Sequence, residues 1–186
     1  MSLRSRSGVI PSAAQAAAAA TQRHEVVIEM LKALDRQARE ADRLGRLAAV
    51  EARRDNYAVF MEFRRKVDEA RTLVVVLYEH ISVFRGAAAE PLREELERLE
   101  LSLLSLTLRA GKQFFSILAS GRALPLGSRD LFEPELEVLH QTRERLRTCF
   151  EGRTIGPDLL PDLAELQSLI ERVLTRSTSL PNFDEE

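Results

Sequence analysis

The sequence predicts an all-α protein, an antiparallel up-down bundle of four or five helices of which the first three are long. Three observations predict it. Apolar side chains recur every three or four residues over long stretches, the spacing of one buried helix face. Between Ser12 and Phe84 there is no proline and only one glycine, Gly45. Farther along, glycine and proline mark short breaks, which favour short loops between antiparallel neighbours.

Length and composition fit a single globular domain. The chain has 186 residues, of which 45% are hydrophobic and 30% charged, enough to bury a core. A net charge of -2 gives no overall attraction to nucleic acid or to anionic lipid. Cys149 is the only cysteine, so an internal disulfide is excluded and a reducing cytoplasm is the simplest compartment. Apolar runs long enough to span a membrane are absent from the sequence.

We divide the chain into three parts. Residues 1–20 form a flexible or Ala-rich leader, residues 21–179 the helical bundle domain, and residues 180–186 an acidic C-terminal tail. Seven of the eight residues at positions 13–20 are alanine, a composition of high helix propensity.

The clearest helix runs from Phe60 to Phe84. Its apolar seam alternates three and four residues: Phe60, Phe63, Val67, Ala70, Val74, Leu77, Ile81 and Phe84. The segment before it keeps a different frame, displaced by one residue, and such a displacement turns the buried face by about 100°. We therefore expect a kink or tight turn near residues 53–56, capped by Asp55 and Asn56. A continuous, bent helix over residues 12–85 is the alternative.

The third helix is expected to lie at the centre. Gly86 is suited to end the preceding helix in a left-handed conformation, and Pro91 to open the next. From there to Gly121 two apolar seams cover most of the helix circumference, which is typical of a helix touched from several sides.

Two shorter helices follow. Asp130 and Glu133 have the spacing of an N-terminal capping box for a helix that ends near Phe150. Its inward residues are expected to be Phe132, Leu136, Leu139, Leu146 and Phe150. Asp158 is suited to cap the last helix, which ends near Thr178.

A basic cluster on the second and third helices is the candidate site for a small anion or an acidic partner. Its members are Arg64, Arg65, Arg109 and Lys112. If the two helices pair about the turn at residues 86–90, these side chains come to one level of the bundle, and arginine forks suit carboxylates and phosphates. The alternative is a solvated face on which they pair with Glu62 or Asp68.

Metal and nucleic-acid sites are weakly supported. Glu137 and His140 have the Glu-x-x-His spacing of a carboxylate-bridged di-iron bundle, but a second such step is absent, so we expect no metal and no cofactor. The arginines of residues 36–54 alternate with acidic residues at ion-pair spacing, which disfavours nucleic acid. Those acidic residues are Asp35, Glu40, Asp42 and Glu51.

The C-terminal tail is a second candidate for partner docking. Phe183 is an apolar anchor in front of three acidic residues, a composition that suits a basic groove. The acidic residues are Asp184, Glu185 and Glu186.

These patterns favour binding over catalysis, since no catalytic motif and no phosphate-binding loop can be recognised. We expect a non-enzymatic bacterial, cytoplasmic adaptor, chaperone or scaffold that binds a protein partner, or its own copy, through long coiled-coil-like helices. Helical hairpins of this length are similar in outline to flagellar and secretion chaperones and to granule-coating phasins, whose motifs the chain lacks. Two alternatives are a sensory bundle that binds an anion near Arg109 and Lys112, and a metal-carboxylate oxidoreductase.

Overall fold

The structure, a computed structural model of the chain, describes residues 13–86, 89–120, 123–149 and 159–179. These residues form helices and no strand. The helices are α1 Ala13–Ala52, α2 Ala58–Ser82, α3 Glu90–Ala119, α4 Ser128–Phe132, α5 Pro134–Cys149 and α6 Leu159–Arg176. Five of them have 16 residues or more, and α4 has five. The predicted all-α bundle with three long leading helices is confirmed.

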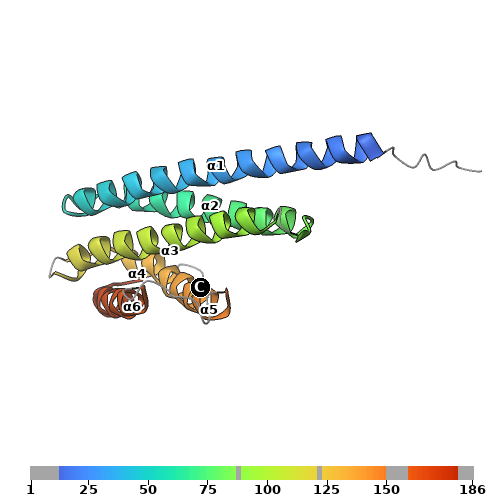
Figure 1. The fold of residues 1–186 in the computed structure, drawn as a ribbon. Coiled ribbons are helices and arrows are strands. Elements are labelled where there is room, and N and C mark those ends of the chain that lie inside the picture. Colours follow the sequence, from blue (N-terminus) through green and yellow to red (C-terminus); the bar gives the residue numbers. More distant parts are fainter. Residues whose placement is uncertain (1–12, 87–88, 121–122, 150–158, 180–186) are drawn as a thin grey trace, which may run out of the picture.

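The three long helices lie side by side and run antiparallel in sequence. Helix α6 packs against α3 on the side away from α1, and α5 lies beside α6 (Figure 1). In that view α6 is seen close to end-on while α1, α2 and α3 run across the page, so α6 crosses them. Helix α3 contacts α1, α2 and α6, which places it at the centre as its two apolar seams predict. None of the described helices is long and apolar enough to cross a membrane.

The predicted break between the first two helices is a tight turn at residues 53–57. Asp55 adopts a left-handed backbone with φ of 59°. The Asn56 side chain accepts a hydrogen bond from the Ala58 amide at 3.3 Å, which satisfies one of the free N–H groups at the start of α2. Two helices, rather than one bent helix, therefore fill residues 13–82.

Two other helix ends differ from the sequence-based expectation. Helix α2 ends at Ser82, a turn before Gly86, whose φ of 70° serves the loop instead of the helix end. The expected capping box is not formed, because α4 starts at Ser128 and Asp130 lies inside it. Pro91 does lie in the first turn of α3, as predicted.

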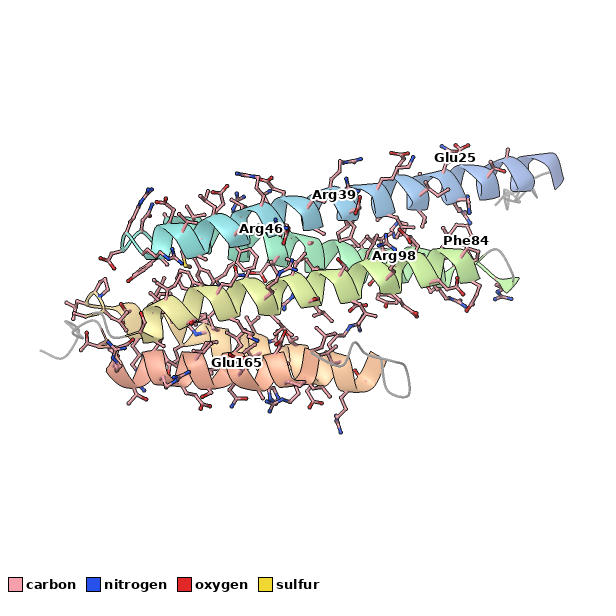
Figure 2. All side chains as sticks on the ribbon, turned by 60° about the vertical axis from the view of Figure 1, so that its left-hand side comes forward. Glu25, Arg39, Arg46, Phe84, Arg98 and Glu165 are labelled. Carbon is pink, nitrogen blue, oxygen red and sulfur yellow. The ribbon has the colours of Figure 1, made fainter. Side chains whose placement is uncertain are left out.

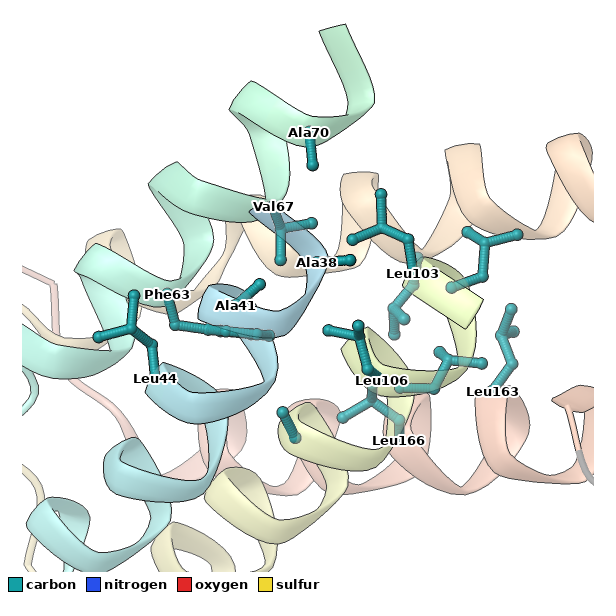
Figure 3. Packing of buried hydrophobic residues seen from close by; sticks show 14 of the residues in the cluster. Ala38, Ala41, Leu44, Phe63, Val67, Ala70, Leu103, Leu106, Leu163 and Leu166 are labelled. Atoms are coloured by element: carbon teal, nitrogen blue, oxygen red, sulfur yellow. The ribbon is translucent and has the colours of Figure 1, made fainter. Parts of the chain in front are cut away.

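The core is one continuous cluster along the predicted seams. Phe60 stacks on Phe114 with ring centroids 3.8 Å apart, and Phe115 and Phe132 meet both rings edge-on. The first of these pairs confirms that α2 and α3 meet in the antiparallel register that the sequence indicates. Toward the middle of the bundle, alanines of α1 face Phe63 and Val67 of α2 (Figure 3). Small and large side chains thus alternate across the contact, which lets the helices approach closely.

Two helical glycines lie where a side chain of a neighbouring helix approaches closely. A Cβ atom at Gly45 of α1 would stand 2.6 Å from the Cβ of Ala110 in α3. A Cβ atom at Gly111 of α3 would stand 2.9 Å from the Leu166 side chain of α6. Both glycines are therefore explained by packing on either side of α3.

Candidate functional site

The four basic residues that the sequence marks as an anion site are divided among separate ion pairs. Their partners are Glu135 for Arg64, Glu69 for Arg65, Asp42 for Arg109, and both Asp162 and Glu165 for Lys112. Those partners lie on α5, α2, α1 and α6 respectively. Each cation thus pairs with at least one carboxylate, and none of these pairs uses Glu62 or Asp68. Asp42 is shared with Arg46, and Glu69 is shared with Lys66.

Lys112 joins α3 to α6. Its Nζ atom lies 2.6 Å from Asp162 and 2.6 Å from Glu165, and these two hydrogen bonds raise the pKa of the ammonium group. Figure 2 shows Glu165 on α6. Together with Gly111 against Leu166, these contacts explain why charge and glycine interrupt an otherwise apolar helix.

A polar seam lies between α5 and the pair α2 and α3. At one end Glu100, which is buried at 5% exposure, accepts hydrogen bonds from Arg145 at 2.6 and 3.2 Å and from the Tyr78 hydroxyl at 2.7 Å. The Arg145 guanidinium also lies 5.0 Å from the Tyr78 ring centre. A forked arginine bond and a phenol donor together compensate the buried carboxylate charge.

The other end of the polar seam holds Glu135, which is 8% exposed. The Nε atom of Arg64 contacts its Oε1 atom, but this buried oxygen has no hydrogen bond among the described residues. Burial raises the pKa of Glu135 to about 7, and the charges of Arg64 and Arg71 oppose that rise only in part. Glu135 therefore titrates within the neutral pH range.

Arg71 occupies the middle of the polar seam. Its Nη2 atom donates to the Thr142 hydroxyl at 3.0 Å, and that hydroxyl donates to the Val138 carbonyl at 2.7 Å. Among the described residues, no carboxylate lies within ion-pair distance of Arg71; Asp68 and Glu135 act on it only at longer range. Burial consequently lowers the pKa of Arg71.

A second candidate, which we call the end groove, lies between α1 and the end of α2. It encloses about 800 Å³ and is lined by Gln22, Arg23, Val26, Val27, Glu79, His80, Val83 and Phe84. Val26 is 47% exposed and Val83 is 62% exposed. His24 of α1 makes an edge-on ring contact with Phe84, just past the end of α2, and α1 runs on beyond this contact (Figures 1 and 2).

The remaining predicted site residues are placed as follows. Glu137 accepts a hydrogen bond from Gln141 at 2.9 Å, and His140 lies beside Leu136 and Arg143 in a shallow surface depression. Within the described ranges, no group of three or more potential metal ligands gathers. The tail at residues 183–186 lies outside the described residues.

The sequence of α5 does carry a signal for the polar seam. Glu135, Leu139, Thr142 and Leu146 follow a four-three-four spacing, so two polar residues occupy a helix face whose other members are apolar. The expected inward residue Leu136 is only partly buried, and Glu135 takes the buried place beside it.

The two candidates differ in what they can do chemically. The end groove offers apolar surface and suits a helix. The polar seam offers arginine and a titrating carboxyl group, and suits a small anion or a proton-linked change in stability. In comparisons with known proteins, no family model, curated protein or solved structure matches this chain.

Proposed function

We propose that this protein is a non-enzymatic helical-bundle interaction protein, an adaptor or assembly scaffold, that associates with a second copy of itself through the end groove. One observation carries the proposal: α1 extends beyond the end of α2 (Figure 1), and an apolar groove lies at the base of the extension.

The apolar side chains of the end groove gather in one place. A single exposed valine is ordinary on a protein surface. Here Val26 and Val83 are both exposed and line the same groove as Phe84. Apolar surface gathered in a hollow and bordered by charged residues is typical of a binding site for another protein.

The occupant we favour is the N-terminal extension of α1 from the second copy. This overhang, residues 13–21, is about 14 Å long at the rise of an α-helix. It is the end of a 40-residue helix, and unsupported helix ends fray in water, so packing against a partner would stabilise it. In the sequence, residues 13–21 carry no charged side chain and are mostly alanine, a composition that suits an apolar groove.

Symmetry favours this occupant over an unrelated helix. The overhang and the end groove adjoin each other on the same chain, so one two-fold rotation places each overhang in the groove of the other copy. Two small apolar contacts of this kind fall at the lower end of stable interfaces, so we expect weak association that depends on concentration.

Sedimentation equilibrium over a range of protein concentrations tests the proposal, with Val26→Glu as the disrupting variant. Val50→Glu is the matched control, because Val50 is also in α1 and is 49% exposed, but lies near the opposite end of the helix. Burying the new carboxylate in an apolar contact is costly, so V26E should weaken the dimer by tenfold or more and V50E should not. A monomeric wild type, or equal dimerisation of both variants, would contradict the proposal.

The alternative, a sensory bundle with an anion held by Arg109 and Lys112, stays a prediction. Both cations already face carboxylates, at 2.8 Å for Arg109 and 2.6 Å for Lys112, so an added anion at either position would compete with an existing ion pair. Docking by the tail at residues 183–186 stays a prediction as well.

A further inference from the structure

A cavity of about 270 Å³ opens between α2, α3 and α5, away from the end groove. We call it the α5 cavity. It is lined by Arg71, Val74, Val75, Glu100, Leu103, Leu104, Gln141, Thr142 and Arg145. Its position follows from how α5 is held: α5 approaches α4 and α6 closely and reaches α2 and α3 through long polar side chains. Space for a small molecule is left between those side chains.

Arg71 is the cation of the α5 cavity whose charge is not matched by an adjacent carboxylate. A guanidinium group has five N–H donors, and the described residues give Arg71 one side-chain acceptor, the neutral hydroxyl of Thr142. A partly buried cation in this situation is under-compensated, because a charge removed from water is stabilised chiefly by an opposite charge and by hydrogen bonds. An anion in the cavity would supply both.

The acidic residue of the cavity does not prevent this. Glu100 would repel an anion if its charge were free, but Arg145 and the Tyr78 hydroxyl already hydrogen-bond its carboxylate. The pair Glu100 and Arg145 is close to neutral as a unit. One positive charge, that of Arg71, is therefore left facing the cavity, which favours a monoanion over a doubly charged phosphate.

Apart from Gln141 and Thr142, the rest of the lining is apolar, and Val74, Val75, Leu103 and Leu104 form these apolar walls. A fully hydrated inorganic anion would gain nothing from such walls, whereas a short hydrocarbon body would bury its surface against them. The volume lies just below the range usual for drug-sized ligands, so the ligand is small. We propose that the α5 cavity binds a monocarboxylate with a short apolar body, its carboxylate held by Arg71 and its body by these walls.

Titration calorimetry with hexanoate tests the proposal on the full-length chain. Two probes separate the parts of the ligand: hexan-1-ol keeps the apolar body without the charge, and acetate keeps the charge without the body. For a ligand of this size we expect hexanoate to bind with a dissociation constant of about 1 mM or below, and both controls to bind at least tenfold more weakly. Hexanoate that does not bind, or hexan-1-ol that binds equally well, would overturn the proposal.

Arg71→Gln tests the residue that carries the charge. Gln keeps hydrogen-bonding capacity toward Thr142 but removes the cation, so hexanoate affinity should fall by about tenfold or more. Arg65→Gln is the matched control, since Arg65 lies on the same helix, is exposed and, among the described residues, forms an ion pair with Glu69 alone, in an i,i+4 arrangement. If R71Q binds hexanoate as tightly as R65Q does, Arg71 is not the anchor and the proposal fails.

Val75→Phe supplies a second variant that leaves every charge in place. Val75 is 58% exposed and lines the cavity, so a larger ring there narrows the space without disturbing the buried core. We expect V75F to fold normally by circular dichroism and to weaken hexanoate binding by tenfold or more. Unchanged affinity in a folded V75F protein would place the bound hexanoate elsewhere and overturn the proposal.

Discussion

The two sides of α3 present different kinds of side chain. Toward α1 and α2 it presents apolar and small side chains, with Phe114 stacked on Phe60 and Ala110 against Gly45. Toward α5 it presents Glu100, which takes part in an ion pair and a phenol hydrogen bond. On the first side the rings and small side chains are in direct contact, whereas the second side borders the α5 cavity.

This difference separates two roles: the apolar side of α3 supplies dense packing, and the polar side supplies charged groups beside an open space. Apolar contacts pack densely because they are not directional, so neighbouring helices can slide until the surfaces fit. Ion pairs and hydrogen bonds fix distance and angle, so they hold α5 at a set separation and leave space beside it. We therefore expect substitutions on the apolar side to change stability at every pH, and substitutions on the polar side to change how stability depends on pH.

The largest effect is expected from Phe114→Ala. Phe114 is fully buried and contacts Phe60, Phe115 and Phe132, so truncation leaves a cavity in the aromatic cluster. We expect the free energy of unfolding, measured by urea titration, to fall by about 3–5 kcal/mol. Phe84→Ala is the control at the open end of the bundle, where the ring is only partly buried, and should cost about 1 kcal/mol. Equal losses in the two variants would contradict the tight packing of the aromatic cluster.

A smaller effect, confined to one pH range, is expected on the polar side at Glu135. Its pKa is about 7 in the folded protein, against 4.5 for the unperturbed group, so between these values the folded state holds a proton that the unfolded state has lost. Stability from this group is complete below about pH 4.5 and is lost as the pH rises through 7. At 1.36 kcal/mol for each pKa unit, the wild type should lose about 2–3 kcal/mol between roughly pH 5 and pH 8.

Glu135→Gln isolates that contribution, because the amide does not titrate. The difference in unfolding free energy between the wild type and E135Q should therefore change with pH by the amount given above. Glu137→Gln is the matched control, since Glu137 lies in the same first turn of α5 but is exposed. Parallel pH profiles for the wild type and E135Q would show that Glu135 ionises in the folded protein as an ordinary carboxyl group does.

The apolar side of α3 could be predicted from sequence because its information is local and periodic. The seam from Phe60 to Ile81 is buried at every third or fourth position as expected, and the one-residue displacement of frame located the turn at residues 53–57. The crossing of α6 over α3 could not be predicted, because periodicity gives the buried face of a helix and not the angle of its neighbour.

The polar side was largely missed for a related reason. Arg71 is one of 27 basic residues, and nothing in the chain near it distinguishes it from the paired arginines of α1. Its partner Thr142 is 71 positions away and meets it only when α5 folds back over α2. The basic cluster around Arg109 and Lys112 stands out in the sequence because those residues interrupt an apolar helix. The partners Asp42, on α1, and Asp162, on α6, were equally remote in sequence.

The smallest effects are expected at Gly45 and Gly111, which lie in the contacts of α3 with α1 and with α6. The change in stability at each glycine tells whether its neighbour is fixed or can move aside. Alanine in place of glycine favours a helix by about 1 kcal/mol. At Gly45 the new methyl group would stand 2.6 Å from the Ala110 Cβ, which cannot move without its backbone, so Gly45→Ala should destabilise by about 1–2 kcal/mol.

At Gly111 the nearest atom, at 2.9 Å, is the end of the Leu166 side chain, which can rotate away at little cost. Gly111→Ala should therefore lie within about 0.5 kcal/mol of the wild type, because the gain in helix propensity offsets the shift of Leu166. Urea unfolding of both variants measures the difference. If G111A loses more stability than G45A, then α6 is held against α3 more rigidly than α1 is, and the densely packed side of the bundle is the one that faces α6.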